Sequence, residues 1–380
     1  MITLASRASG YRLPRPLRAV LVAALLYLFL VGVSSLEAGI KGLGAEFQAG
    51  LLESVDNPVA GVCAGVLATV LVQSSSVSTA TIVGLVGAGT LNVESAVPMI
   101  LGANIGTTIT NTLASLASIG RSGEFRRAFA AAIQHDFFNI IAVLIFLPLQ
   151  VATGFLSEAA YWLADLLGGN VAGGKTRSPI KEVVKEPVRQ AQDLLGGAIE
   201  SDRIVGALLL ALGLLLIFMS LALITINMRR LFAERLERSL NSAVARGSGL
   251  VGMAIGVVTT ISVQSSSITT SILIPLVGSG VLTLRNAFPI TLGANVGTTV
   301  TALLASLAVD LRAGLVVALT HTLFNLAGIG LIYPFRPLRD VPVRLAERVS
   351  TIAAVHPLLV ALYVIGTFVV GPVVGIVVLR

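Results

Sequence analysis

The residues best suited to chemistry are two identical polar runs that interrupt long apolar stretches. Each run is a glutamine followed by three serines, at residues 73–76 and again at residues 264–267. A serine hydroxyl donates or accepts a hydrogen bond, and the glutamine adds an amide. Helices that begin at such runs offer free N–H groups to an anion, whereas carbonyl and side-chain oxygens suit a hard cation. The two runs together predict a site for an oxyanion and alkali ions.

The two runs belong to a duplication. Residues 73–118 align with residues 264–309 without gaps at one constant offset of 191 (264 minus 73), and about half of the positions are identical. The segment LGANIGTTIT of the first copy reads LGANVGTTVT in the second. Further on, HDFFN at 135–139 aligns with HTLFN at 321–325. Chance does not produce such agreement over this length, so the chain contains two structural repeats.

Each copy adds an asparagine and two threonines in a segment where the helix is expected to unwind. The two threonines lie three residues apart and therefore share a helical face. These residues are Asn104, Thr107 and Thr110 in the first copy, and Asn295, Thr298 and Thr301 in the second. Their oxygens extend the predicted site.

Asp136 is the only acid within a predicted span between residues 57 and 153. An intramembrane carboxylate is a functional candidate by default, here as a cation ligand or a proton acceptor. Asn139 lies one turn away on the same face, and Asn325 is its equivalent in the second copy. Asp136 itself is replaced by Thr322 there. The two copies are therefore chemically different at this position.

Composition shows which elements must carry these residues. Of 380 residues, 55% are hydrophobic and 12% are charged, and the mean hydropathy is +0.92. A soluble domain carries about 25% charged residues, so most soluble enzymes, disordered proteins and nucleic-acid binders are excluded and a polytopic membrane protein is indicated. The net charge of +7 fits basic loops on the cytoplasmic side. The single cysteine, Cys63, excludes an intrachain disulfide.

Apolar runs and charged gaps divide the chain into two repeats and their connections. We expect repeat 1 at 1–168, an extramembrane linker at 169–202, repeat 2 at 203–335, and a basic loop with a C-terminal transmembrane helix at 336–380. Repeat 1 is expected to hold a first helix, an interfacial segment at 37–56, a hairpin at 58–89, and helices at 96–118 and 128–150. Repeat 2 is expected to hold a helix at 204–226, a hairpin at 249–280, and helices at 288–308 and 313–333. The chain then crosses the membrane about seven or eight times.

The two polar runs each split a charge-free segment into arms of roughly 12–15 residues, shorter than the ~20 that a bilayer requires. Such a segment predicts a re-entrant hairpin that is buried in protein or lines a cavity. Placing the basic loops on the cytoplasmic side gives the two repeats opposite orientations. The predicted fold is an all-α polytopic membrane protein with two inverted-topology repeats, each with a re-entrant helical hairpin and a broken transmembrane helix, as in secondary transporters.

Charge is scarce where the polar runs lie. Glu94 is the only charged residue across 57–118, and Arg285 is the only one across 249–309. Both lie outside the hairpins, which carry no charge. Because no Lys or Arg in these segments neutralises a bound anion, a bare divalent anion would be very costly in a low dielectric. Cations bound beside the anion remove this cost. The pattern therefore favours sodium symport of a small oxyanion.

These motifs resemble the type II sodium–phosphate cotransporter family, over about residues 20–333. The resemblance rests on the paired QSSS runs, the paired GAN(I/V)GTT segments, EFRRAF at 124–129 and HDFFN at 135–139. It implies sodium-driven import of inorganic phosphate, mainly divalent, by alternating access. In that family an aspartate at the position of Asp136 marks members that move net charge, so the resemblance implies electrogenic transport with about three sodium ions. The short linker without a cysteine pair is typical of a prokaryotic member.

The resemblance also implies the binding residues. The phosphate set is Gln73, Ser74, Ser75, Ser76, Gln264, Ser265, Ser266, Ser267, Asn104 and Asn295. The sodium set is Asp136, Asn139, Asn325, Thr107, Thr110, Thr298, Thr301, Gln264 and Ser265. We expect no catalytic residue, no cofactor besides sodium as the coupling ion, and no nucleic acid. The expected partners are phosphate, sodium and the lipid bilayer, for a monomer or homodimer in the bacterial inner membrane.

Three other functions compete with phosphate symport. The first is transport of another anion, such as sulfate or an organic anion, or coupling to protons through Asp136. The second is an intramembrane serine hydrolase that pairs a QSSS serine with His135 or His321, although no G-x-S-x-G elbow is present. The third is a channel. The two histidines are expected to hydrogen-bond within the helix bundle rather than to ligate a metal.

Overall fold

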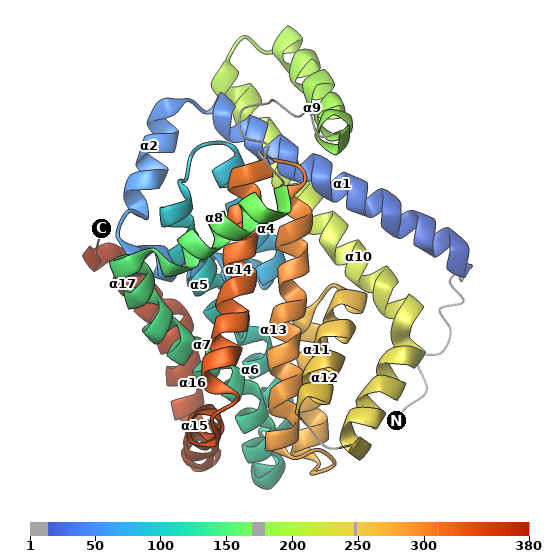
Figure 1. The fold of residues 1–380 in the computed structure, drawn as a ribbon, viewed down its shortest axis with the longest axis vertical. Coiled ribbons are helices and arrows are strands. Elements are labelled where there is room, and N and C mark those ends of the chain that lie inside the picture. Colours follow the sequence, from blue (N-terminus) through green and yellow to red (C-terminus); the bar gives the residue numbers. More distant parts are fainter. Residues whose placement is uncertain (1–13, 169–178, 247–248, 310, 380) are drawn as a thin grey trace.

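The computed structural model describes residues 14–168, 179–246, 249–309 and 311–379. These residues form helices and no strand (Figure 1). The start of repeat 1 at 1–13 and the linker residues 169–178 lie outside the described residues. The first half holds α1 (Arg15–Gly42), α2 (Ala45–Ser54), α3 (Pro58–Val72), α4 (Ser75–Gly87), α5 (Val93–Gly106), α6 (Ile109–Ser115), α7 (Ser122–Thr153), α8 (Phe155–Gly168) and α9 (Pro179–Ala198).

The second half repeats much of this order. It holds α10 (Asp202–Arg246), α11 (Leu250–Val263), α12 (Ser266–Gly278), α13 (Leu284–Ser306), α14 (Leu311–Ile332), α15 (Arg336–Val355), α16 (Pro357–Ile365), a π-helix (Gly366–Val370) and α17 (Gly371–Leu379). Within the described residues, six helices are long and apolar enough to cross a membrane, or up to seven if the bent pair of α2 and α3 forms one span. The chain is therefore an all-α, multi-pass membrane protein, whose upper count of seven spans in the described residues equals the lower of the two numbers expected.

Both predicted hairpins are present as pairs of short helices. The arms of the first are 15 and 13 residues long, and those of the second are 14 and 13. Arms of this length fall short of the ~20 residues that span a bilayer. The two arms of each pair pack against each other. In each hairpin the chain breaks at the first two residues of the polar run, as the sequence pattern predicts.

A glycine at the same position of each copy lets the hairpin lie close to the helix that follows it. A Cβ atom at Gly65 of α3 would collide with the carbonyl oxygen of Met99 in α5. At the matching place in the second copy, a Cβ at Gly256 of α11 would collide with the carbonyl oxygen of Ile290 in α13. Small residues permit such close backbone approach between membrane helices. The duplicated glycines therefore fix each hairpin against its neighbouring span in the same way.

The expected break in the helix after each hairpin occurs in one repeat only. In the first repeat the helix is interrupted at Thr107 and Thr108, between α5 and α6. In the second repeat α13 runs without interruption through the matching Thr298 and Thr299. The prediction of a broken helix in repeat 2 is therefore wrong. The same motif does not suffice to break a helix.

The two repeats interlock through their hairpins and their peripheral helices. The hairpin helix α4 packs on α13 of the other repeat, and α12 packs on α6. Likewise α8, which follows α7, packs on α14, whereas α15, which follows α14, packs on α7. The long helices α1 and α10 cross each other beside this core (Figure 1). Each repeat thus contributes elements to the surroundings of the other.

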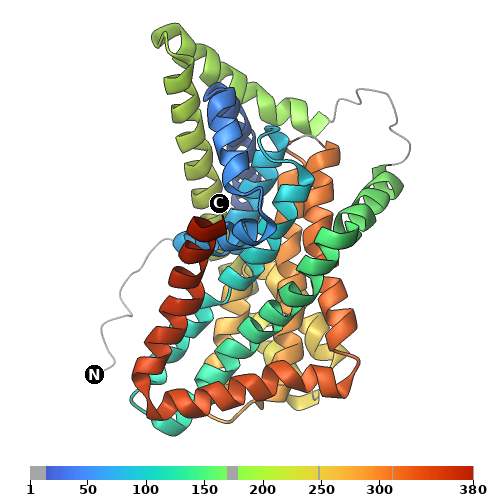
Figure 2. The same cartoon turned by 90° about the vertical axis from the view of Figure 1, so that its left-hand side faces the viewer.

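Two segments expected to be irregular are helical. The described part of the linker forms α9, whose buried Val184 and Val188 lie one turn apart and face α1. The segment after residue 335, expected as a basic loop, forms α15, with Val343, Ala346 and Ala353 buried. Both segments carry many charged residues on their outer face and only a few apolar residues at helical spacing, so the helical pattern was not recognised in the sequence. The two helices lie at opposite ends of the molecule (Figure 2).

Candidate functional site

The tips of the two hairpins have the same backbone geometry. Gln73 and Gln264 both have φ of 56°, in the left-handed region, and are the only non-glycine residues with positive φ in the described chain. The next residue in each case is extended and caps the second arm. Ser74 accepts a hydrogen bond from the Val77 amide at 3.3 Å, and Ser265 accepts one from the Ile268 amide at 3.3 Å. The left-handed residue ends one arm and the serine cap begins the other.

The remaining serines of the polar runs lie in the first turn of the second arm. Ser75, Ser76 and Ser266 are buried, and Ser267 is half-buried. Both second arms therefore start at the tip, where the first-turn N–H groups have no partner within the helix. Hydroxyls and free N–H groups gathered in one place are the donors that an oxyanion requires. Each hairpin thus gathers the four expected residues of its own run at its tip.

Each tip glutamine contacts a threonine of the helix that follows the hairpin. The Thr110 hydroxyl donates to Gln73 Oε1 at 3.2 Å, and the Thr301 hydroxyl donates to Gln264 Oε1 at 3.3 Å. Each glutamine also donates from Nε2 to a carbonyl of its own arm, at 2.6 Å and 2.9 Å. Both of these predicted threonines therefore lie at the tips. A side-chain carbonyl and a hydroxyl in contact are two of the oxygen ligands that alkali ions use.

The asparagines that recur in the two copies lie in a buried network between the repeats and make no hydrogen bond to the serine hydroxyls. His135 Nε2 lies 2.6 Å from Asn295 Oδ1, and Asn295 donates to Asn139 Oδ1 at 2.9 Å. Asn139 in turn donates to the Asn104 backbone carbonyl at 2.7 Å. Every bond of this set joins one copy to the other or one span to the next. The network therefore fixes the relative position of the helices that carry the tips.

The same network recurs with the roles of the copies exchanged. His321 Nε2 lies 3.4 Å from Asn104 Oδ1, and Asn325 donates to the same oxygen at 3.3 Å. All three residues are buried. Both histidines thus hydrogen-bond within the bundle, as expected. This half of the network is longer and looser than the half around Asn295.

Thr107 and Thr298 are placed differently from the two threonines at the tips. Their hydroxyls donate to carbonyls of their own helices, Thr107 to Ala103 at 3.1 Å and Thr298 to Ala294 at 3.0 Å. Both side chains are buried. Each hydroxyl oxygen keeps lone pairs for another donor or a cation. These two predicted residues therefore belong to the helix core beside the tips.

Asp136 is fully buried on α7, and only one of its two carboxylate oxygens accepts a hydrogen bond. The hydroxyl of Tyr363, in α16, donates to Asp136 Oδ2 at 2.6 Å. Asp136 Oδ1 has no hydrogen-bond partner. Asp136 does not share a hydrogen bond with Asn139, its expected neighbour, whose amide joins the central network instead. Sequence reasoning missed Tyr363, because it lies 227 residues away in a span without motifs.

Asn111 is a second polar residue that the sequence reasoning missed. Its Oδ1 accepts hydrogen bonds from Thr270 at 2.9 Å and from Ser271 at 3.1 Å. Asn111 lies on α6 of the first copy and both donors lie on α12 of the second, so the contact ties one hairpin to the opposite repeat. The position aligned with Asn111 is Ala302. A comparison of mismatched positions between the copies, rather than of matched ones, would have singled it out.

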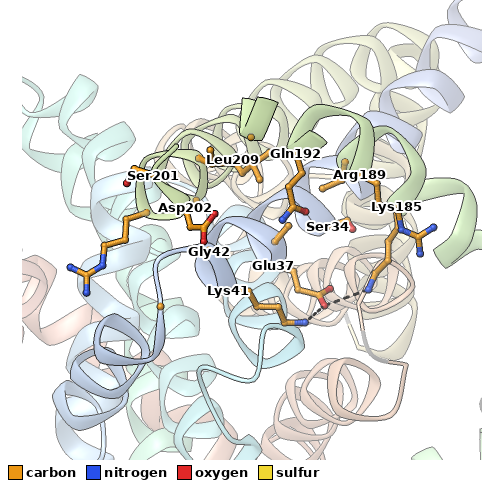
Figure 3. A pocket seen from close by; sticks show the side chains of 17 residues that line it. Ser34, Glu37, Lys41, Gly42, Lys185, Arg189, Gln192, Ser201, Asp202 and Leu209 are labelled. Atoms are coloured by element: carbon orange, nitrogen blue, oxygen red, sulfur yellow. Dashed lines mark hydrogen bonds and ion pairs between the residues drawn. The ribbon is translucent and has the colours of Figure 1, made fainter. Parts of the chain in front are cut away.

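A large cavity elsewhere in the molecule takes no part in this site. Its volume is 820 Å³, and it lies between α1, α9 and α10 (Figure 3). Its acidic centre, Glu37, pairs with Lys41 at 2.7 Å and with Lys185 of α9 at 3.6 Å. No residue of either hairpin lines the cavity. The Lys185–Glu37 ion pair attaches the linker helix α9 to α1, which is a structural role.

The comparisons with known proteins identify the family of this chain. A model of the Na+/Pi-cotransporter family matches residues 28–160 and 205–340, one block in each repeat. Sodium-dependent phosphate transport protein 2A of Mus musculus is 32% identical over 427 residues, which cover 94% of this chain and 67% of the relative. Sodium-dependent phosphate transport protein 2B of Homo sapiens is 32% identical over 443 residues, which cover 93% and 64%. No solved structure matches the chain. By the family model and these identities, the chain belongs to the Na+/Pi-cotransporter family.

Proposed function

We propose that the chain is a sodium-coupled symporter that imports inorganic phosphate by alternating access. The observation that carries the proposal is the pair of equivalent hairpin tips, each with a left-handed glutamine, capping serine and buried hydroxyls. The relatives, which are named sodium-dependent phosphate transport proteins, support the same substrate and ion. The proposed location is the bacterial inner membrane, and the proposed assembly is a monomer or a homodimer. These two points rest on the sequence pattern.

The charge of the tips supports co-transport rather than transport of the anion alone. The arms of both hairpins contain no charged residue, so a divalent phosphate bound there meets only hydroxyl, amide and N–H dipoles. Such an anion in a low dielectric requires compensating charge nearby. Sodium ions held by the oxygens around the tips provide it. Phosphate then binds well only after sodium, which is the physical origin of the coupling.

We assign the residues of the tips to phosphate and the surrounding oxygens to sodium. The phosphate set is the two QSSS runs with Asn104 and Asn295, whose amides are held by the central network. The sodium set is Asp136, Asn139, Asn325, the four threonines of the GAN(I/V)GTT helices, Gln264 and Ser265. The contacts of Thr110 with Gln73 and of Thr301 with Gln264 support the assignment, because they place predicted oxygen ligands together.

The proposal includes net charge movement. Asp136 has an open oxygen, is fully buried and has no counterpart in the second copy, where Thr322 stands. A carboxylate in this position adds one cation site to those that the two tips share. Divalent phosphate with about three sodium ions then moves one positive charge per cycle. A neutral residue at the same position removes that site and makes the cycle electroneutral.

Two inverted repeats account for alternating access. Symmetric hairpins placed on opposite sides of the bilayer give one gate toward each side. The crosswise packing of α4 on α13 and of α12 on α6 supports this arrangement, because each gate then rests on the other repeat. Hydrolysis is disfavoured by the same geometry. Within the described residues, His135 and His321 hydrogen-bond to asparagines rather than to a serine of the polar runs.

Phosphate-evoked current in proteoliposomes, recorded against sodium concentration, tests the proposal. Uptake of labelled phosphate is expected to require sodium, to saturate and to resist competition by sulfate. Ser75→Ala and Ser266→Ala are expected to reduce uptake at least about tenfold, because each removes a hydroxyl from one tip. Ser279→Ala, at the exposed base of the second hairpin, is the matched control and is expected to transport normally. Sodium-independent uptake, or preference for sulfate, would contradict the proposal.

A further inference from the structure

The last span of the chain contacts the rest of the molecule at few positions. Only 11% of the residues in its most apolar window, within Leu358–Leu379, are buried, against 33% or more in each of the other five spans. Tyr363 of this span is half-buried, and its hydroxyl donates to Asp136 Oδ2 at 2.6 Å in the centre of α7. A carboxylate at membrane depth is costly unless it is paired. The Tyr363 hydroxyl gives Asp136 a hydrogen-bond donor there.

The ring of Tyr363 is held on two sides. It packs edge to face with Phe129 of α7, with ring centroids 6.1 Å apart, and with Phe368 of its own span, at 6.3 Å. Phe368 is fully buried and lies within the π-helix Gly366–Val370, which begins three residues after Tyr363. A π-helix turn is rare and occurs mostly at functional sites, where it rotates side chains out of the regular helical register. Here it turns Phe368 inward, against the tyrosine.

Only one of the two carboxylate oxygens of Asp136 has a hydrogen-bond partner. Oδ2 accepts the tyrosine hydroxyl, whereas Oδ1 is buried and has no hydrogen-bond partner. A hydrogen bond from a fixed donor restricts rotation of the carboxyl group and so determines where Oδ1 points. A buried, oriented and unpaired carboxylate oxygen is a ligand prepared for a cation.

We infer that Tyr363 is a positioning residue for the cation site at Asp136, and that it acts through this hydrogen bond without contacting the ion. The inference rests on the proposed function, since it presumes that Asp136 binds sodium. It assigns the last span a task besides crossing the bilayer: the π-helix and Phe368 fix the ring, the hydroxyl fixes Oδ2, and Oδ1 remains for the ion. Loss of the hydroxyl leaves the carboxylate free to rotate, which weakens ion binding.

The test is Tyr363→Phe, which keeps the ring contacts and removes only the hydroxyl. The sodium concentration for half-maximal phosphate-evoked current is expected to rise about tenfold, as for loss of a hydrogen bond to a charged group. The phosphate concentration for half-maximal current, measured at saturating sodium, is expected to stay unchanged. Tyr161→Phe, on the peripheral helix α8, is the matched control and is expected to behave as the unaltered chain.

A double variant separates positioning from a structural role. In an Asp136→Gly background, Tyr363→Phe is expected to have no further effect on the sodium dependence of phosphate uptake, because the group that it positions is gone. Phe368→Leu loosens the ring and is expected to give a smaller shift in the same direction. An unchanged sodium dependence of Tyr363→Phe, or an equal shift in the Asp136→Gly background, overturns the inference. Absence of sodium-dependent uptake by the unaltered chain overturns the proposed function instead.

Discussion

The two repeats agree at their hairpin tips and differ in the helices that support them. Both tips have a glutamine at φ 56°, a capping serine and a glutamine–threonine contact. Around the tips, the first repeat has a broken helix, a carboxylate at Asp136 and an amide at Asn111, whereas the second has a continuous helix, Thr322 and Ala302. The comparison teaches that duplication gave two tips of the same geometry. The differences lie in the supporting helices, which carry a carboxylate, an extra amide and an interruption in the first copy alone.

The two copies differ in the residues just beyond the shared motif. After the paired threonines, the first copy continues with Asn111 and Thr112 and the second with Ala302 and Leu303. Ala and Leu are among the strongest helix formers, whereas Asn and Thr are weak ones. The Asn111 side chain also has its partners on α12, across the repeat boundary. Weak propensity and an external partner together favour the interruption in the first copy.

The largest expected effect concerns a feature that the repeats share. Gly65→Ala and Gly256→Ala each place a Cβ against a carbonyl oxygen of the following helix, which is expected to cost about 3 kcal/mol or more of stability. Thermal unfolding in detergent measures the loss, which is expected to be equal in the two variants. Gly50→Ala, in α2, meets no neighbouring atom and is the control. Unequal losses would show that the two hairpins are attached differently.

A smaller effect is expected where the repeats differ in charge. Asp136→Gly is expected to reduce phosphate-evoked current by more than about tenfold while sodium-dependent phosphate uptake continues, because the additional cation site is lost. Thr322→Gly, at the aligned position, introduces the same helix-weakening glycine and is expected to keep the current. Electrophysiology on a supported membrane compares the two. Equal voltage dependence of the Asp136→Gly variant and the unaltered chain would refute the assignment.

The amide at Asn111 is expected to matter less. Asn111→Ala makes the first copy resemble the second and removes two hydrogen bonds to α12, with an expected loss of about 1 kcal/mol. Amide hydrogen exchange is expected to slow at residues 107–112, because the helix gains propensity, and to quicken in α12. Asn227→Ala, which loses a bond only to its own helix, is the control. Faster exchange at 107–112 would contradict this explanation of the break.

The smallest effect concerns the contacts at the two tips. Thr110→Val and Thr301→Val each remove one hydroxyl–glutamine hydrogen bond, at 3.2 Å and 3.3 Å. We expect each to raise the sodium concentration for half-maximal uptake about threefold, consistent with a neutral hydrogen bond of ~0.5–1 kcal/mol. Uptake assays over a sodium range measure both. A shift in one variant alone would mean that the tips bind ions unequally.

Local patterns in the sequence predicted the hairpins, because a polar run inside a charge-free segment permits few other structures at membrane depth. The serine caps follow from the same few residues, whereas the left-handed glutamines do not, because that conformation is unfavourable for a residue with a Cβ. Contacts between distant segments were beyond this reasoning. Tyr363 with Asp136 and Asn111 with Thr270 join residues separated by 227 and 159 positions, and neither pair has a repeated counterpart. Charge concealed α9 and α15, whose apolar faces are narrow.

The left-handed glutamines have a consequence for how the tips tolerate change. A residue with a Cβ in this conformation is strained by about 1–2 kcal/mol, whereas glycine is not. Gln73→Gly and Gln264→Gly would therefore relax the backbone while deleting the amide, so stability and transport would move in opposite directions. Stability alone would favour glycine at both tips, yet both positions hold glutamine. The two tips are places where folding and binding select for different residues.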